Sequence, residues 1–143
     1  MYNLPLYLEN AERQLAKAKL WAAIQEIYAQ KARSACPEER RRLNRTIDER
    51  VIRFNRDFPK GPNYLDLHWM TKWGAVRFVK REMRLRTGAL IVETGVGNNS
   101  ARGVGQIREA ILALKMPMVS VTSNRGVLVL RLLLRIPVAS GVP

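Results

Sequence analysis

The spacing of apolar residues predicts two long helices in the first part of the chain. Residues 9–35 contain no glycine or proline and are rich in strong helix formers. Apolar side chains recur at helical spacing in two stretches: Trp21, Ile24 and Tyr28, then Leu43, Ile47, Val51 and Phe54. Because a proline disfavours helical geometry in the residue before it, Pro37 should end the first helix. Residues 1–58 are therefore expected to form an antiparallel helical hairpin.

The pattern changes after residue 62, where short apolar runs alternate with helical stretches. Residues 59–62 contain two prolines and a glycine and are predicted to be a linker. Strands are expected at 64–67, 89–93, 118–121 and 127–133. One helix should begin after a Thr71 cap and run to about Arg84, and another should end near Leu114. This β-α-β-α-β-β order over residues 63–135 predicts a two-layer α/β sandwich, with residues 136–143 as a C-terminal tail.

Charge is unevenly distributed over these two parts. The chain has 143 residues and a net charge of +13, with 25 Lys and Arg against 12 Asp and Glu. Residues 1–59 hold 12 basic and 8 acidic residues, a net +4, whereas residues 60–143 hold 13 and 4, a net +9. Such an excess is typical of proteins with a polyanionic partner, so nucleic acid is the expected partner and the α/β part the expected contact.

A stripe of basic residues on the first helix of the α/β part is the strongest candidate for contact with a nucleic-acid backbone. Its members recur at i, i+3, i+4 and i+7: Arg77, Lys80, Arg81 and Arg84. A second group of arginines, within residues 40–53, fits RNA contact and a solvated face balanced by nearby carboxylates equally well.

Cysteine and apolar-run content bear on compartment. Cys36 is the only cysteine, so no disulfide framework is expected and a reducing compartment is favoured. No apolar run approaches the roughly 18 residues of a membrane span, and no secretory signal precedes the chain's first helix. A cytoplasmic location is expected, with a mitochondrial one as the alternative, and no membrane partner. The sequence makes no prediction of oligomeric state.

Candidate chemistry lies at the ends of the first two strands. Side chains alternate along a strand, so Asp66 and His68, the only histidine, should point the same way. Residues 93–100 then form a glycine-rich turn before a helix. A carboxylate and an imidazole near backbone donors suit the handling of phosphate. One histidine and no cysteine cluster supply too few ligands for zinc. A Mg²⁺ site on Asp66 and Glu93 would need more carboxylates than this region offers, so no metal or cofactor is predicted.

Four ordered motifs resemble the Smr (small MutS-related) domain family. Residues 65–68, Leu-Asp-Leu-His, resemble the start of its Leu-Asp-Leu-His-Gly motif, and residues 94–100, Thr-Gly-Val-Gly-Asn-Asn-Ser, resemble its Thr-Gly-Arg/Lys-Gly-x-His-Ser motif. Residues 103–108 and 126–132 are similar to its glycine-to-helix segment and its closing strand. The resemblance covers roughly residues 63–133, and the upstream hairpin is similar to the extension found in many eukaryotic members.

The resemblance implies RNA binding and metal-independent cleavage close to ribosomes. The family's Asp-x-His falls on Asp66 and His68, with His68 as acid or base and Asp66 as its orienting partner. The 2′-hydroxyl would attack the adjacent phosphate and leave a cyclic phosphate and a 5′-hydroxyl. Phosphate or RNA contacts are expected from the glycine-rich segment, through backbone groups or side chains of Gly95, Gly97, Asn99, Arg102 and Gly103.

Three departures from the family pattern leave two functions open. Trp69 replaces the glycine after the first histidine, Val96 replaces the basic residue of the second motif, and Asn99 replaces its histidine. Arg102 could supply the missing charge, and Trp69 could stack on a base or pack on Trp73. The chain is therefore either an RNA endonuclease acting on messenger or ribosomal RNA, or a non-catalytic adaptor or structural subunit of a ribonucleoprotein such as a ribosome.

Overall fold

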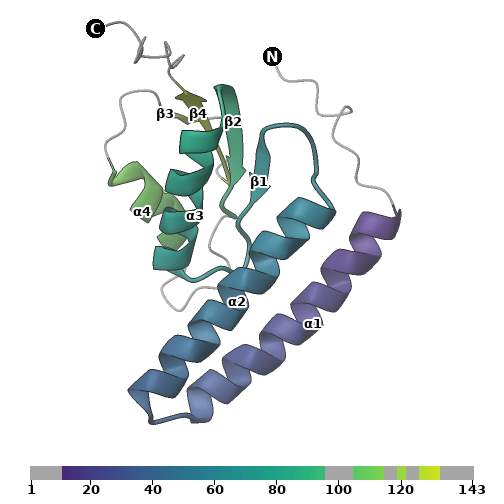
Figure 1. Cartoon of the computed structure of the whole chain (residues 1–143), viewed down its shortest axis with the longest axis vertical. Coiled ribbons are helices and arrows are strands. Elements are labelled where there is room, and N and C mark those ends of the chain that lie inside the picture. The colour runs from purple at the N-terminus through teal and green to yellow at the C-terminus, as the bar shows by residue number, and fades with distance from the viewer. Residues whose placement is uncertain (1–10, 96–104, 115–118, 122–125, 133–143) are drawn as a thin grey trace, which may run out of the picture.

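The fold combines a helical hairpin with a small mixed sheet and two further helices (Figure 1). The computed structural model describes residues 11–95, 105–114, 119–121 and 126–132. Along the chain the elements are α1 (Ala11–Arg33), α2 (Pro37–Asp57), β1 (Tyr64–Asp66), α3 (Lys72–Leu85), β2 (Gly88–Glu93), α4 (Gln106–Leu112), β3 (Val119–Val121) and β4 (Val127–Leu132). The predicted α/β class and the predicted helices and strands are confirmed, with boundaries shifted by at most two residues where they lie in the described ranges.

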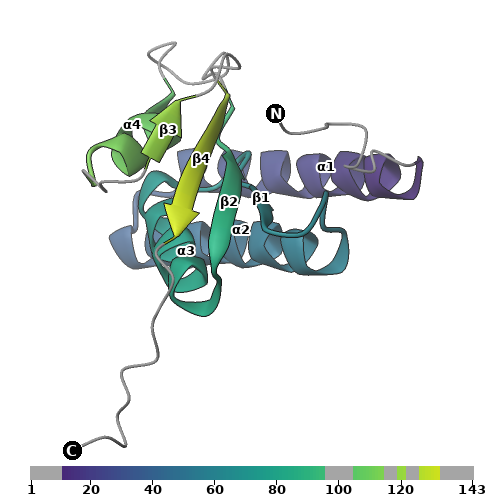
Figure 2. The ribbon, with the colours of Figure 1, turned by 90° about the horizontal axis from the view of Figure 1, so that it is seen from above.

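Helices α1 and α2 lie side by side in both Figure 1 and Figure 2, which sees the molecule from above. Pro37 occupies the first turn of α2, where its missing N–H leaves no helical bond unmade. The predicted apolar face of α2 is buried, including Ile47 at 0% and Val51 at 1% exposed. On α1 the fully buried residue is Ile24. The hairpin therefore buries one stripe of each helix, as its sequence pattern predicts.

The four strands form one sheet in the order β1-β2-β4-β3. β1 and β2 are parallel, and β4 is antiparallel to both β2 and β3. In the parallel pair Asp66 lies opposite Glu93, and the Leu67 N–H donates to the Glu93 carbonyl oxygen at 2.9 Å. The carboxyl ends of β1 and β2 thus bring two acidic residues to the same edge of the sheet.

The apolar core contains residues from both sides of the predicted linker at residues 59–62. One cluster joins buried residues of α1 and α2 to those of α3, α4 and one face of the sheet, the sheet residues being Leu65, Leu90, Val92, Leu128 and Leu130. The opposite face presents Tyr64, Ile91 and Val129, which alternate with them. Residues 59–62 do turn the chain, but the hairpin and the α/β part share a single core.

Helices α2 and α3 meet at a buried carboxylate. Asp48 of α2 is 6% exposed and accepts hydrogen bonds from the Thr71 backbone N–H at 2.8 Å and from its hydroxyl at 2.7 Å. Thr71 also caps α3 as predicted, by accepting from the Gly74 N–H at 3.2 Å. Gly74 lets the helices approach, since an added Cβ would lie 2.0 Å from an Asp48 carboxylate oxygen.

None of the helices in the described residues is long and apolar enough to cross a membrane.

Candidate functional site

Asp66 sits at the end of β1, is only 2% exposed and is held from several sides. Its Oδ2 accepts from Lys17 Nζ at 2.9 Å and from an Arg13 guanidinium nitrogen at 3.3 Å. Its backbone is fixed by Asn55, whose amide accepts from the Asp66 N–H at 2.7 Å and donates to its carbonyl at 2.8 Å. The second carboxylate oxygen, Oδ1, is thereby aimed at His68.

The imidazole of His68 is held through Nδ1 by two carboxylates. Nδ1 lies 2.7 Å from Asp66 Oδ1 and 3.2 Å from Glu93 Oε2, and the His68 backbone N–H donates to the same Asp66 oxygen at 3.1 Å. Burial would lower the pKa of His68, but the hydrogen bonds to Asp66 and Glu93 outweigh it and raise the pKa to about 9. His68 is therefore an imidazolium at neutral pH.

The two carboxylates are ionised in return. Burial acts to raise the pKa of Asp66, but the hydrogen bond from His68 and the charge of Lys17 hold it well below its usual range. Burial likewise opposes ionisation of Glu93, yet its hydrogen bond with His68, helped by Tyr64 and Lys60, lowers its pKa to about 2. The site is a network of alternating charges rather than a pair of neutral groups.

Glu93 is a site residue that the sequence indicated only as part of an incomplete magnesium site, and not as a partner of His68. It ends β2 directly opposite Asp66, accepts a hydrogen bond from the Tyr64 hydroxyl, and lies 3.1 Å from Lys60 Nζ. A signal was present, because parallel neighbouring strands place the residues at their carboxyl ends together. The predicted strands at 64–67 and 89–93, if paired in parallel, bring Glu93 beside Asp66.

Helix α1 supplies the two cations that pair with Asp66, which sequence reasoning also missed. Arg13 is 3% exposed and its Nε donates to the Phe58 carbonyl at 3.0 Å, while its guanidinium lies 5.0 Å from the Phe54 ring centre. Lys17 follows one turn later, with Nζ 5.8 Å from the Trp69 ring centre. The hairpin is thus part of the site, and Asp66 is paired across the predicted boundary between the two parts.

The remaining ring nitrogen of His68 lies beside Gly95. A Cβ added to Gly95 would come within 2.9 Å of His68 Nε2, and Gly95 has a φ of +76°. Its N–H donates to the Gly126 carbonyl at 3.2 Å, next to the Thr94 N–H, which donates there at 2.7 Å. The Gly95 N–H is thus already bonded to the carbonyl of Gly126, the residue before β4, and phosphate contact at Gly95 stays a prediction. A glycine at this position leaves room beside Nε2.

The rest of the predicted glycine-rich site lies outside the described residues. This concerns Val96, Gly97, Asn99, Arg102 and Gly103.

Trp69 packs within the protein and not on Trp73. Its φ is +70°, its ring stacks on Trp21 of α1 with centroids 4.8 Å apart, and its carbonyl accepts from the Tyr28 hydroxyl at 2.8 Å. Packing on Trp73 was the wrong expectation, because Trp73 is 62% exposed. A tryptophan occupies a left-handed backbone position here, which is where a glycine is ordinarily favoured.

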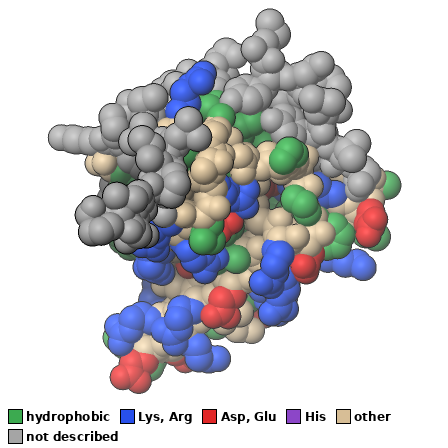
Figure 3. All heavy atoms as spheres, turned by 45° about the horizontal axis from the view of Figure 1, so that its top comes forward, with side chains coloured by type: hydrophobic (Ala, Val, Ile, Leu, Met, Phe, Trp, Pro, Cys, Tyr) green, Lys and Arg blue, Asp and Glu red, His purple; other side chains and the backbone are tan. Residues whose placement is uncertain are grey.

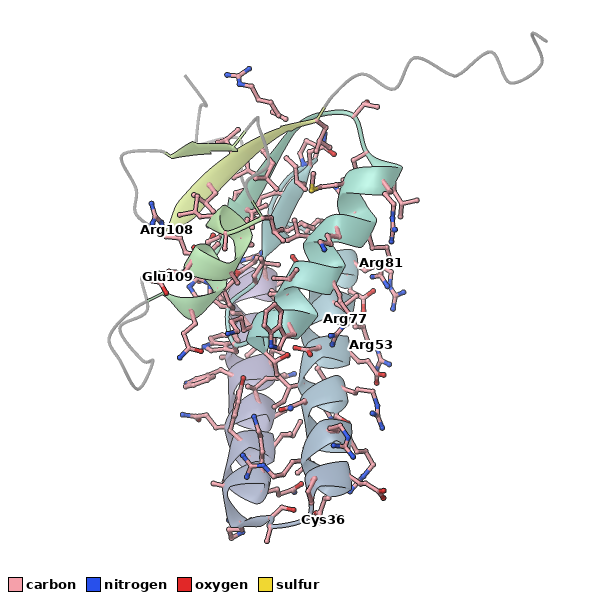
Figure 4. All side chains as sticks on the ribbon, turned by 90° about the vertical axis from the view of Figure 1, so that its left-hand side faces the viewer. Cys36, Arg53, Arg77, Arg81, Arg108 and Glu109 are labelled. Carbon is pink, nitrogen blue, oxygen red and sulfur yellow. The ribbon has the colours of Figure 1, made fainter. Side chains whose placement is uncertain are left out.

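The predicted basic stripe is exposed along α3: Arg77, Lys80, Arg81 and Arg84. In Figure 4, Arg77 and Arg81 lie on the same side of the view as Arg53 of α2, whereas Arg108 and Glu109 of α4 lie on the other side. Figure 3, which brings the top of Figure 1 forward, shows several groups of Lys and Arg side chains among hydrophobic and acidic ones on the part not drawn grey. The stripe does not join the Asp66 cluster but forms a separate basic surface.

Asp66, His68 and Glu93 also offer three ligand atoms within 4.8 Å of one another, a spacing compatible with a metal ion. Their charges are already balanced by Lys17, Arg13 and Lys60, and His68 Nδ1 faces both carboxylates. A divalent cation would have to displace these cations and the Nδ1 proton, so the donor set fits an imidazolium better than a metal.

No family model matches the chain, and neither a curated protein nor a solved structure matches it.

Proposed function

We propose that this chain is an Smr-like protein that binds RNA and cleaves it without a metal ion. The observation that carries the proposal is the imidazolium of His68, held at Nδ1 by Asp66 and Glu93 with Nε2 beside Gly95. A fixed proton donor at the edge of a sheet, next to a glycine-rich segment, is suited to a phosphodiester.

Three features support the family assignment. The β1-α3-β2-α4-β3-β4 order is the one predicted from the apolar pattern, and we propose that it is the Smr-like order. The Asp-x-His motif brings its two side chains into contact at 2.7 Å. Trp69 stands where the family has glycine and adopts a φ of +70°, the conformation that a glycine at this position would serve.

The charge state of His68 favours the role of acid over that of base. With a pKa of about 9 the ring carries its proton at neutral pH, so Nε2–H can donate and cannot accept. In the proposed reaction the 2′-oxygen bonds to phosphorus, its proton leaves to solvent, and the bond from phosphorus to the 5′-oxygen breaks. Nε2 gives its proton to that leaving oxygen, which yields a cyclic phosphate and a 5′-hydroxyl.

RNA is the substrate class because this reaction needs a 2′-hydroxyl and because the chain carries a net charge of +13. The exposed cations of α3 give the backbone contact that the Asp66 cluster, with its charges balanced internally, does not offer. Messenger or ribosomal RNA, and a ribosome as the place of action, remain the proposed targets. A cytoplasmic or mitochondrial setting suits either.

The test is incubation of end-labelled single-stranded RNA with the purified protein in excess EDTA, beside His68→Ala. We expect the parent to cut and leave a cyclic phosphate, and His68→Ala to bind but not to cut. Arg33→Ala, which removes an exposed cation at the end of α1, is the matched control and should cut like the parent. Equal cleavage by the parent and His68→Ala would contradict the proposed chemistry.

A dependence of rate on pH tests the acid role separately. The rate should rise with pH while hydroxide assists removal of the 2′-proton, and should level off near pH 9 as His68 loses its proton. Glu93→Gln removes one of the groups that raise the pKa of His68, so the break should move to lower pH. A break near pH 6.5 in the parent would show that Asp66 and Glu93 do not raise the pKa of His68.

The second candidate function is a non-catalytic RNA-binding module within a ribonucleoprotein. It is favoured by the departures at Val96 and Asn99 and by the internal pairing of both carboxylates. In that case the parent and His68→Ala bind RNA with equal affinity and neither cuts, with or without added ribosomes.

A further inference from the structure

The exposed tryptophan at the start of α3 is the feature that the proposed site leaves unused. Trp73 is 62% exposed, whereas Trp21 and Trp69 stack on each other inside the fold. Lys72 Nζ lies 4.6 Å from the Trp73 ring centre, so the indole carries a neighbouring cation and still keeps most of its surface accessible. A tryptophan exposed to this extent gains little of the stabilisation that burial of an indole ordinarily provides.

Trp73 shares its face of α3 with the basic stripe. Arg77, Lys80 and Arg84 follow it at i+4, i+7 and i+11, which places all four on one side of the helix. The buried residues Ala75, Phe78 and Val79 lie on the other side. The result is one exposed face with an aromatic ring at its beginning and cations along its length.

Acidic side chains are scarce on this face of α3. The one acidic residue of α3, Glu82, is bound by Arg86 at 2.8 Å, with Arg81 3.9 Å away. Among the described residues no carboxylate lies within ion-pair distance of Arg77, Lys80 or Arg84. Within the described part of the chain, Lys80 and Arg84 have no carboxylate partner, and Arg77 interacts at longer range with the buried Asp48 carboxylate, so all three cations can contribute to binding an anion.

We propose that this face of α3 is a platform for single-stranded RNA, with one base stacked on Trp73 and the following phosphates bound by Arg77, Lys80 and Arg84. The inference rests on the proposed function and names its substrate as unpaired RNA. Stacking on an aromatic ring needs a base whose face is accessible, which a duplex does not present within its length. A basic face without the tryptophan would suit duplex and single strand alike.

The platform lies close enough to the proposed acid to hold the same strand. Trp73 follows His68 by five positions, so their Cα atoms are at most about 18 Å apart. Thr71 caps α3 and bonds Asp48 of α2, which fixes the start of the helix relative to the core. A strand stacked on Trp73 can therefore reach His68 within a few nucleotides.

The experiment measures equilibrium binding of three fluorescent probes: a 12-nucleotide single strand, its duplex, and the same strand with abasic sites. The variants are Trp73→Ala, Trp73→Phe and the pair Arg77→Gln with Lys80→Gln. Leu85→Ala is the matched control for exposed apolar surface on α3, at 73% exposed. Lys19→Gln with Arg33→Gln is the control for the loss of two charges, from exposed positions of α1.

We expect Trp73→Ala to weaken binding of the single strand about tenfold or more, as loss of one stacked base would. Trp73→Phe should recover part of this affinity. The abasic strand and the duplex should be affected less than twofold. The double variant Arg77→Gln with Lys80→Gln should weaken binding of all three probes. For the single strand, the slope of log K against log salt concentration should become less negative by about 1.4.

Unchanged single-strand affinity in Trp73→Ala, or an equal loss for duplex and abasic probes, overturns the platform while leaving RNA binding intact. Equal salt slopes for the α3 pair and the α1 control pair overturn it as well. If the parent binds none of the probes, the proposed function fails first, and the platform fails with it.

Discussion

Two buried carboxylates, Asp66 and Asp48, join the same two parts of this protein through different kinds of partner. Both are almost inaccessible, at 2% and 6% exposed. Asp66 belongs to the α/β part and is paired with cations of α1, whereas Asp48 belongs to α2 and accepts neutral hydrogen bonds from the cap of α3. Each part thus inserts one acidic side chain into the other.

The difference shows that partners, and not burial alone, set the state of a buried acid. Burial raises the pKa of Asp48, and the hydrogen bonds from Thr71 do not offset it. The same burial at Asp66 is outweighed by His68 and Lys17, which lower its pKa. Asp48 therefore serves as a structural joint, while Asp66 organises charge for His68.

The largest effect should come from removing the carboxylate at Asp66. Asp66→Ala leaves Arg13 buried beside Lys17 without the shared anion, so we expect the free energy of unfolding to fall by about 3–5 kcal/mol. Urea denaturation measures this, with Asp57→Ala as a control, since Asp57 is exposed and its pairing with Arg56 is weak. Adding Arg13→Met to Asp66→Ala should restore part of the loss. A double variant no more stable than Asp66→Ala would show that the loss does not come from the buried charge of Arg13.

Gly74→Ala should be the next largest and acts on the Asp48 joint. The new Cβ would lie 2.0–2.6 Å from the Asp48 carboxylate, so α2 and α3 must separate and the hydrogen bonds to Thr71 must lengthen. We expect a loss of about 3 kcal/mol in thermal or urea unfolding. In a helix without this contact, alanine would stabilise by up to about 1 kcal/mol. A stabilised Gly74→Ala protein would thus show that the joint does not exist.

The dependence of stability on pH tests the charge network that Asp66 forms with His68 and Glu93. Because the pKa of His68 is raised from 6.5 to about 9 in the folded state, its contribution is complete below pH 6.5 and is lost as pH rises through 9. Formally this is about 3 kcal/mol, and partial exposure of the ring reduces it to about 2 kcal/mol. Glu93, whose pKa is lowered to about 2, should lose its contribution as pH falls below 4.5.

Urea denaturation between pH 3 and 10 should therefore give greatest stability at about pH 4.5–6.5. His68→Gln should lack the alkaline decline. Since the chain has a single histidine, NMR titration of its ring reports the pKa of His68 directly. A value near 6.5 would contradict the charge network.

The smallest effect is expected for Asp48→Asn. Both groups that bond this side chain are donors from Thr71, and an amide retains one acceptor oxygen for them. We expect a loss of about 1 kcal/mol, in contrast to Asp66→Asn, which should be several times more costly. Similar losses for the two Asn variants would erase the distinction between a structural joint and a charge centre.

Local sequence signals were sufficient for the elements and for part of the site. Apolar residues at a period of 3.6 locate the helices within the described residues, and short apolar runs locate the strands. The alternation of side chains along a strand brings Asp66 and His68 into contact. These features depend on neighbours along the chain, or on a motif only three residues long.

The missing parts of the site depend on contacts between distant segments. Arg13 and Lys17 are 53 and 49 residues from Asp66, and a charged residue is ordinarily assigned to the solvated side of a helix. Their phase contained a signal, because positions 13, 17, 24 and 27 fall on one face with the buried Ile24 and Ile27. Trp69 was misassigned for the same reason, since its stacking partner Trp21 lies in α1.

The placement of Arg13 and Lys17 on a buried helical stripe constrains where this chain can change length. One residue inserted between Lys17 and Ile24 turns the preceding part of α1 by about 100° and carries both cations away from Asp66. The short connection at residues 34–36, between α1 and α2, absorbs an insertion without changing the phase of either helix. Insertions and deletions in relatives of this chain should therefore collect at the tip of the hairpin and be excluded from the first half of α1.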